Sequence, residues 1–458
     1  MVELTKTDNS AIAKPVEPPW PRPIYAWYTV GVLMLAYTNS FIDRQIISLL
    51  IEPIRRDLQI NDTQVSLLAG IAFTIFYTLM GVPIARLSDE KNRRGIIMIG
   101  ISVWSAMTAL CGMANQYWQL FLARMGVGVG EATLSPAAMS IISDYFPVTK
   151  LARAISVYSM GVYFGAGLAL IIGGFVVKLV SQANNITLPL IGEVYPWQVT
   201  FFVVGLMGLP IILLLMTVKE PLRRGRAKTT DNSNASSVAE LKKFVRANMR
   251  TLTYHFLAFS FIGIGIIGYM VWTPTLFIRT WGWQASEIGF VYGFILFFGG
   301  TSGVYAGGFL ADWLQKRGHS DAILRAACFC ALMAIPFTVA TPLVSNPYVA
   351  VAGLAITSFF LAMPQGLPAA ALQVIAPNAL RAQLTALYFL IGNMIALGFG
   401  PTVYALVTDY VFEDPNMLRY SIALVSVIVM PLGALFSFLA LKPYRASVVR
   451  SQRIAAAA

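Results

Sequence analysis

The sequence predicts an all-α membrane protein with twelve transmembrane helices in two pseudo-symmetric six-helix bundles. Three observations predict this fold: the chain is strongly apolar, its apolar residues form runs long enough to cross a bilayer, and two motifs recur about half a chain apart. Of its 458 residues, 57% are hydrophobic and 12% are charged, and the mean hydropathy is +0.68. A soluble chain of this length carries about twice that charged fraction.

Twelve apolar runs define the expected helices, because about 20 apolar residues span a hydrocarbon core of ~30 Å. A polar residue, Asn61 or Asp62, precedes the second run and is expected to cap that helix. The predicted helices are 26–50, 63–87, 94–114, 117–143, 152–180, 197–218, 252–278, 287–311, 322–344, 347–375, 382–408 and 418–441.

One long polar interruption, at 219–250, divides these runs into six and six. Its composition is typical of a flexible linker, and its last part predicts a short amphipathic helix at 238–249 on the inner membrane surface. The expected organisation is a tail at 1–23, a first bundle at 24–218, the linker at 219–250, a second bundle at 251–441 and a tail at 442–458.

The distribution of basic residues predicts the orientation. Of the 33 Lys and Arg residues, 26 lie in the two tails and in the loops on their side of the membrane. Because Lys and Arg favour the cytoplasmic side, both termini are expected in the cytoplasm, and the formal charge of +12 needs no nucleic-acid partner. Residues 1–23 lack a cleavable-signal pattern, and the three cysteines lie in apolar runs without a disulfide or metal pattern. These features favour a bacterial inner (plasma) membrane.

An internal repeat links the two halves of the chain. The loop at 85–94, after the second predicted helix, resembles the loop at 308–317 after the eighth, and their aspartates are 223 residues apart. Similar loops also follow the fourth and tenth helices, with Pro147 and Pro377 lying 230 residues apart. Two such repeats predict two similar bundles, with substrate bound at mid-membrane while one bundle rocks against the other.

Four charged residues interrupt the apolar runs: Asp43, Arg44, Arg124 and Glu131. A charge at membrane depth costs from about 3 to well over 10 kcal/mol, so it usually marks a transport pathway or a proton site. Arg124 and Glu131 are about two helical turns apart, so they face the same way at roughly 10 Å. A carboxyl group influenced by both burial and a nearby arginine can bind and release a proton near neutral pH, which makes Asp43 and Glu131 the proton-coupling candidates. The alternative is a permanent salt bridge between the first and fourth helices.

The repeated loops resemble the signature of the major facilitator superfamily, approximately Gly-x-Leu-Ala-Asp-Arg-x-Gly-Arg-Arg. Gly308–Asp312 matches it almost fully, whereas the first copy has Ala85 and Asn92 at the two glycine positions. In that family the motif latches the cytoplasmic ends of the two halves. The resemblance implies a gating role for the charged residues of these loops, namely Asp89, Arg93, Arg94, Arg153, Asp312, Lys316 and Arg317.

A narrower resemblance, over about residues 25–175, is to the spinster branch, whose members move sphingosine-1-phosphate and lysophospholipids. Its most specific elements are the Asp43-Arg44 pair and the run Gly130-Glu131-Ala132, with Ser135-Pro136-Ala137 following. The resemblance implies that Asp43 and Arg44 line the central cavity with Glu131 close by. It also implies that Arg124 is their counter-ion or a substrate anchor.

The two halves differ in the polarity of their predicted membrane segments. The second half carries essentially no charge at membrane depth and is rich in aromatic residues. A cavity that is charged on one wall and apolar on the other suits an amphiphile with an ionic head group. The candidate substrate or counter-ion residues are Arg44, Arg124, Asn39, Ser135, Tyr163, Tyr269, Trp272, Gln365 and Asn393.

The sequence therefore predicts a proton-coupled secondary active transporter of a lipid-like amphiphile, of lysophospholipid or sphingosine-phosphate type, that works by alternating access. Its expected partners are the substrate, protons and membrane lipids, and we expect a monomer. Two alternatives stay open: a transporter of a small organic anion, with Arg44 and Arg124 as carboxylate clamps, and a non-coupled lipid flippase or receptor. No catalytic constellation, metal-ligand set or cofactor motif is recognisable, so neither an enzyme nor a cofactor is expected.

Overall fold

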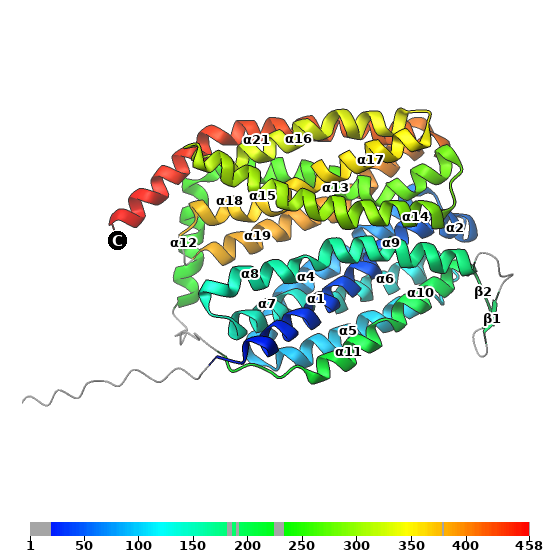
Figure 1. The fold of residues 1–458 in the computed structure, drawn as a ribbon, viewed down its shortest axis with the longest axis horizontal. Coiled ribbons are helices and arrows are strands. Elements are labelled where there is room, and N and C mark those ends of the chain that lie inside the picture. Colours follow the sequence, from blue (N-terminus) through cyan, green and yellow to red (C-terminus); the bar gives the residue numbers. More distant parts are fainter. Residues whose placement is uncertain (1–19, 181–185, 189–191, 224–232, 378–379, 458) are drawn as a thin grey trace, which may run out of the picture.

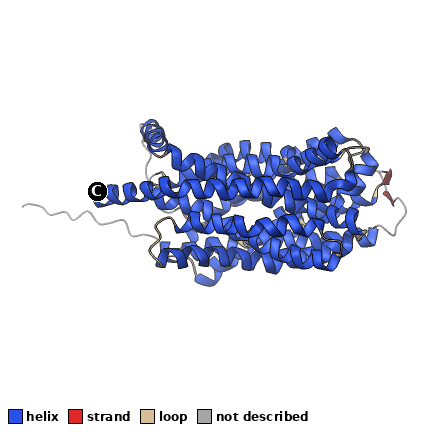
Figure 2. Cartoon of the chain, turned by 90° about the horizontal axis from the view of Figure 1, so that it is seen from above, coloured by secondary structure: helices blue, strands red, loops and turns tan. Residues whose placement is uncertain are grey.

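The computed structural model describes residues 20–180, 186–188, 192–223, 233–377 and 380–457, and it is built almost entirely of helices (Figures 1 and 2). Within these residues, eleven helices are long and apolar enough to cross a membrane. The remaining predicted span, the first along the chain, is α1 (Pro23–Gln45), whose apolar residues alternate with tyrosines, threonines and an asparagine. The predicted helical, multi-span fold is confirmed.

The first bundle contains the predicted spans one to six, most of which consist of two helices placed end to end. They are α1 and α2 (Ile47–Leu58), α3 (Asp62–Ala69) and α4 (Ile71–Glu90), α5 (Arg93–Cys111), α6 (Tyr117–Glu131) and α7 (Leu134–Tyr145), α8 (Val148–Ser159) and α9 (Gly161–Val180), and α10 (Pro196–Leu206) and α11 (Gly208–Thr217). Between α9 and α10, strands β1 (Ile186–Leu188) and β2 (Gly192–Val194) pair in antiparallel fashion.

The second bundle contains spans seven to twelve, and three of its helical segments have π geometry. Its elements are α13 (Met249–Trp281), α14 (Ala285–Phe294), π-helix η1 (Ile295–Gly300), α15 (Thr301–Lys316), α16 (Ala322–Ala340), η2 (Thr341–Leu343), α17 (Pro347–Ala362), η3 (Met363–Gly366), α18 (Leu367–Ile375), α19 (Arg381–Asn393), π-helix η4 (Met394–Phe399), α20 (Gly400–Val407), π-helix η5 (Thr408–Phe412), η6 (Pro415–Met417) and α21 (Leu418–Ala457).

The two bundles lie side by side, with α9 packed against α14 and α3 and α4 packed against η4 and α20 (Figure 1). Glycines allow the backbones to approach closely at these seams. A Cβ atom at Gly167 of α9 would lie 2.7 Å from the carbonyl oxygen of Gly293, and one at Gly70, between α3 and α4, would lie 2.5 Å from that of Gly398. Larger side chains at these positions would push the bundles apart.

α12 (Ser233–Ala247) and the last part of α21 lie at one end of the bundles, together with the start of α1 (Figure 1). α12 crosses this end between the two bundles, five residues ahead of the predicted start of the linker helix (Figure 1). α21 continues as helix to Ala457, so residues predicted as a tail after 441 extend the last helix instead. We call the opposite end of the bundles, where α2 and the β-hairpin lie, the distal end.

Candidate transport site and gate

Glu131, the last residue of α6, forms an ion pair with Arg44 of α1. Arg44 Nε donates a hydrogen bond to Glu131 Oε2 at 2.6 Å, and the Ser40 hydroxyl donates to the same oxygen. Glu131 is buried, whereas the Arg44 side chain is 13% exposed. The other oxygen of Glu131, Oε1, is buried without a hydrogen-bond partner among the described residues. One charge pair thus joins the first and fourth spans at membrane depth.

Three aromatic rings surround the Arg44 guanidinium. Its central carbon lies 4.9 Å from the ring centre of Phe41 and 4.6 Å from those of Phe73 and Tyr77. Phe41 is on α1, one turn before Arg44, and the other two rings are one turn apart on α4. These distances fall within the ~6 Å at which a cation is attracted by the face of an aromatic ring.

Asp43 and Arg124 form a second contact between the same two spans. The Thr108 hydroxyl donates to Asp43 Oδ1 at 2.6 Å, while Asp43 Oδ2 has no partner in the described part of the chain. Arg124 Nη1 donates to the backbone oxygen of Asp43 at 3.2 Å, and its Nε donates to that of Leu68 at 3.4 Å. Arg124 Nη2 is buried and, within the described structure, has no partner.

Two expectations are corrected by this geometry. The ionic partner of Glu131 is Arg44 and not Arg124, because Arg44 reaches Glu131 from the neighbouring helix α1, whereas Arg124, two turns before Glu131 on α6, donates to the backbone oxygens of Asp43 and Leu68. Asp43 is fully buried, so it does not line an opening in this conformation. Of the four charged residues, Arg44 is the one whose side chain keeps measurable exposure.

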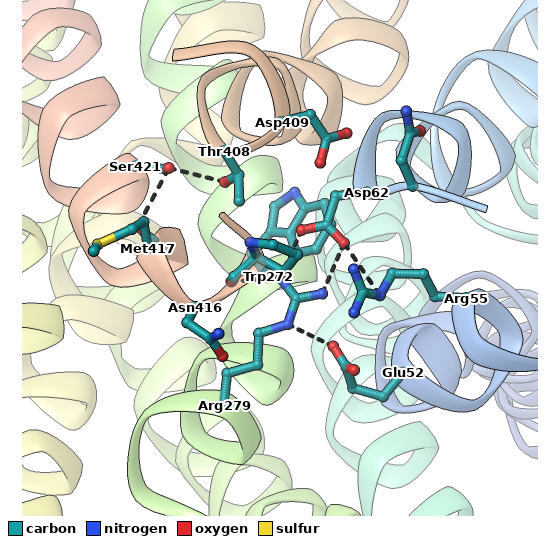
Figure 3. Close-up of polar contacts among 12 residues, drawn as sticks. Glu52, Arg55, Asp62, Trp272, Arg279, Thr408, Asp409, Asn416, Met417 and Ser421 are labelled. Atoms are coloured by element: carbon teal, nitrogen blue, oxygen red, sulfur yellow. Dashed lines mark hydrogen bonds and ion pairs between the residues drawn. The ribbon is translucent and has the colours of Figure 1, made fainter. Parts of the chain in front are cut away.

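At the distal end, Arg279 of α13 binds two carboxylates of the first bundle (Figure 3). Its Nε donates to Glu52 at 2.6 Å, and its Nη1 and Nη2 donate to the two oxygens of Asp62 at 2.6 and 2.7 Å. Asp62 is fully buried, and Arg55 approaches it at 3.9 Å. This bidentate arrangement is the strong geometry for an arginine and a carboxylate.

Asp409 of η5 adds a second polar contact between the bundles at the distal end. Its Oδ2 accepts hydrogen bonds from the backbone N–H and the hydroxyl of Thr63, at 2.6 and 2.7 Å. Thr63 lies in the first turn of α3, where backbone N–H groups lack helical partners, so a carboxylate is favourable there. One turn further, the Ser66 hydroxyl donates to Thr402 at 3.2 Å. Together with Arg279, these contacts close the distal end.

The first-half substrate candidates lie around the site and along the bundle seam. Asn39 is buried, and its amide nitrogen has no partner among the described residues. The Ser135 hydroxyl lies 3.5 Å from that of Tyr158. Tyr163 lies at the seam, because a Cβ at Gly300 of the second bundle would come within 2.4 Å of its ring.

The second-half candidates do not share one environment. Trp272 is fully buried and its Nε1 donates to the Pro401 carbonyl at 2.8 Å, so it packs α13 against α20 and does not line a cavity. Tyr269 is also buried, and its hydroxyl has no partner in the described part of the chain. Gln365 in η3 is exposed, and Asn393 at the end of α19 is half-buried.

Arg93 and Arg94, predicted to gate, hold the ends of the first bundle together in this conformation. Arg93 is buried and pairs with Asp144 and, at 2.7 Å, with Glu220. Arg94 Nη1 donates to the Val218 carbonyl at 2.9 Å. These contacts join α5 to the end of α7 and to the segment that follows α11.

The other gating candidates are exposed or lie outside the described side chains. Asp312, Lys316 and Arg317 are exposed, with the Arg317 guanidinium 3.7 Å from the ring centre of Trp313. The Arg153 guanidinium lies 5.6 Å from the ring of Trp27. The Asp89 side chain is not among the described side chains, so its predicted role as a latch stays a prediction.

Sequence reasoning missed the residues that close the distal end. Glu52, Arg279 and Asp409 attract no attention as isolated residues near the ends of apolar runs, and Asp62 was expected only as an alternative helix cap. Asn61 is the residue that caps α3, in a capping box with Gln64. One signal was available: Arg279 is among the few basic residues on the side of the membrane that Lys and Arg avoid.

Comparisons with known proteins agree with this architecture. A solved structure described as a bacterial homolog to the human lysosomal transporter spinster, in an inward-facing and unoccupied conformation, is 27% identical and has a TM-score of 0.77, covering 93% of this chain and 99% of that one. An MFS-type efflux pump of Mycolicibacterium smegmatis is 27% identical over 439 residues, 94% of this chain and 96% of its own length. Protein spinster of Drosophila melanogaster is 26% identical over 301 residues, 64% of this chain and 46% of its own length.

The family model that matches describes the Major Facilitator Superfamily and covers residues 33–401, most of the chain. The spinster relative of this chain and the structure of the bacterial spinster homolog confirm the resemblance to the spinster branch. The protein is therefore an integral, multi-pass membrane transporter and not an enzyme. The chain belongs to the Major Facilitator Superfamily.

Proposed function

We propose that this protein is a proton-coupled secondary transporter of an amphiphilic, lipid-like molecule, of the lysophospholipid or sphingosine-phosphate class. The observation that carries the proposal is the ion pair between buried Glu131 and partly exposed Arg44 in the first bundle. A charge pair at membrane depth is a poor way to stabilise a bundle compared with apolar packing, which favours a role in function.

The hydrogen-bond pattern of Glu131 suits a group that binds a proton. Both of its donors, Arg44 and Ser40, converge on Oε2, and Oε1 is left without a partner in the described structure. A proton on the carboxyl group would remove the negative charge that holds Arg44. The freed guanidinium could then bind an anionic group of the substrate, which links protonation to substrate binding.

The contrast between the bundles supports an amphiphile as substrate. The buried side of the second bundle near the seam presents neutral groups, such as Tyr269 and the rings of Tyr292 and Phe297, whereas the first bundle presents Arg44. The ionic head group of an amphiphile would contact the first bundle, and its apolar chain would contact the second. We place both termini in the cytoplasm, so the closed distal end faces outward, as in the inward-facing spinster homolog.

The test is transport into proteoliposomes as a function of pH. The variant Glu131→Gln, which keeps the size of the side chain and one acceptor oxygen, is expected to lose the pH dependence of transport. Asp43→Asn tests the second candidate in the same way. Unchanged pH dependence in both variants would remove proton coupling from the proposal, and binding without any substrate-driven proton flux would favour a non-coupled flippase or receptor.

A small organic anion is the second candidate substrate, because Arg124 offers an unpaired Nη2 within the described structure, close to the Arg44 site. Two guanidinium groups would bind a carboxylate well. Thermal unfolding in the presence of saturating lysophospholipids or dicarboxylates distinguishes the candidates, because a ligand that binds only the folded state raises the unfolding temperature. Stabilisation by dicarboxylates alone would replace the lipid proposal.

A further inference from the structure

The side chains around Arg44 are of the kind that bind a cation: besides the carboxylate of Glu131, they include three aromatic rings. Phe41, Phe73 and Tyr77 place three ring faces within 4.9 Å of the guanidinium carbon, and Glu131 supplies a carboxylate at 2.6 Å. We call the three rings the aromatic cage. Phe73 and Tyr77 stack on each other with centres 5.2 Å apart, so the two α4 rings form a continuous wall.

Such a set of groups has a specific chemical preference. Several aromatic faces around one point recognise quaternary ammonium groups, because the faces carry negative electrostatic potential and a methylated ammonium is weakly hydrated. A carboxylate beside the rings adds a charge that a cation needs at membrane depth. Arg44 fills this position from within the same chain, and Arg44, Phe41 and Tyr77 are each partly exposed.

We propose that the aromatic cage binds the ammonium group of a zwitterionic head group, and that Arg44 occupies the cage until the substrate arrives. This inference rests on the proposed function and narrows its substrate class to amphiphiles that carry both a phosphate and an ammonium group. When the head group enters, its ammonium replaces the guanidinium between the rings, and Glu131 releases the proton that freed Arg44 and pairs with this ammonium. Arg44 then pairs with the phosphate of the same molecule.

The exchange keeps every charge paired. Before binding, the guanidinium faces Glu131 and the phosphate and ammonium of the free head group are in water. After binding, Arg44 and the ammonium face the phosphate and Glu131, so the exchange adds no unpaired charge at membrane depth, where it would be costly. An amphiphile with phosphate alone would draw Arg44 away and leave Glu131 and the rings without a cation.

The experiment compares two lysophospholipids with the same palmitoyl chain, lysophosphatidylcholine and lysophosphatidylglycerol, binding to the full-length protein in nanodiscs, with protein-free nanodiscs as the blank. Tyr77→Leu removes one ring face. It is expected to lower the ratio of lysophosphatidylcholine affinity to lysophosphatidylglycerol affinity by about 3- to 30-fold, the range of a cation–π contact, because the choline lipid exchanges one cage cation for another, whereas the glycerol lipid draws Arg44 out and leaves the cage without a cation. Tyr77→Phe keeps the ring and is expected to preserve both affinities within about 2-fold.

Phe41→Leu, on the other helix, is an independent variant with the same expected result, should Tyr77→Leu not fold. A fall in the choline-to-glycerol affinity ratio supports the cage. An unchanged ratio of the two affinities would overturn the cage while leaving an amphiphilic substrate in place. Failure of the unsubstituted protein to bind either lysolipid would overturn the proposed function, and the cage with it.

Discussion

The Arg44–Glu131 ion pair and the Arg279–Asp62 ion pair have the same 2.6 Å contact distance, but they differ in the parts of the molecule that they connect. The first pair links two spans of one bundle, and the second links the two bundles at the distal end. If the bundles move as rigid bodies, the first pair survives every conformation unless a proton or a ligand breaks it. The second pair exists only while the distal end is closed.

This difference assigns the two pairs to different tasks. An ion pair within a bundle can respond to a bound proton or ligand, and the movement of the bundles does not itself break it. A pair between bundles adds its free energy to one conformation alone and therefore sets the ratio of closed to open molecules. The reactivity of a buried seam residue measures that ratio. Ser66 is 1% exposed and lies between the bundles, so Ser66→Cys, with the three native cysteines replaced by alanine, becomes accessible to a maleimide only after opening.

The largest effect is expected for Arg279→Ala. It leaves Glu52 without its cation and removes the bidentate partner of Asp62, which is fully buried and keeps only Arg55 at 3.9 Å in the closed state. Breaking a buried pair by removing one partner costs about 3–5 kcal/mol, and each 1.4 kcal/mol is tenfold, so the labelling rate at position 66 should rise by more than about 100-fold.

The matched control for this variant is Arg56→Ala. Arg56 is also an arginine near the distal end, but its side chain is 74% exposed and its partner is its neighbour Asp57 in the same bundle. The labelling rate should stay within about 2-fold of the parent. A rise as large as that of Arg279→Ala would mean that any loss of charge opens this end, and the comparison would fail.

A smaller effect is expected for Asp409→Ala. Thr63 loses the acceptor of its N–H and hydroxyl hydrogen bonds, which costs about 1–2 kcal/mol in the closed state and raises the labelling rate about 5- to 30-fold. Asp409→Asn keeps an acceptor oxygen and should have a smaller effect. Asp414→Ala is the control within one bundle, because Asp414 accepts from Asn416 of its own bundle. Equal labelling of Asp409→Ala and the parent would show that Arg279 closes the distal end alone.

The helix positions could be predicted from the sequence because apolar run length and bilayer thickness decide them. For example, the run predicted at 322–344 is observed as α16 and η2, which together end at Leu343. The presence of four charged residues at one site could also be predicted, because each is conspicuous in an apolar segment. Their pairing could not be predicted, because whether Arg44 reaches Glu131 depends on how α1 and α6 are positioned along each other, which is a tertiary feature.

The distal contacts were harder to predict for a related reason. Arg279 lies 217 residues after Asp62 and 227 after Glu52, in the other bundle, and nothing local distinguishes a cross-bundle ion pair from ordinary helix-end charges. The π geometry of η5, which presents Asp409 to α3, is likewise a tertiary feature. Spacing within one helix predicts which side chains share a face, but not which helix that face meets.

The smallest effect is expected for Thr251→Val, which removes a contact inside the second bundle. The Thr251 hydroxyl lies 2.8 Å from that of Ser447, joining α13 to α21, and Ser447 also donates to the Pro443 carbonyl. Because Ser447 keeps this acceptor, no buried donor is left without a partner, and the cost should be about 1 kcal/mol or less in thermal unfolding. The labelling rate at position 66 should not change, since both helices move together. A clear increase in that rate would mean that the second bundle deforms as the distal end opens, and that the division into contacts within and between rigid bodies does not hold.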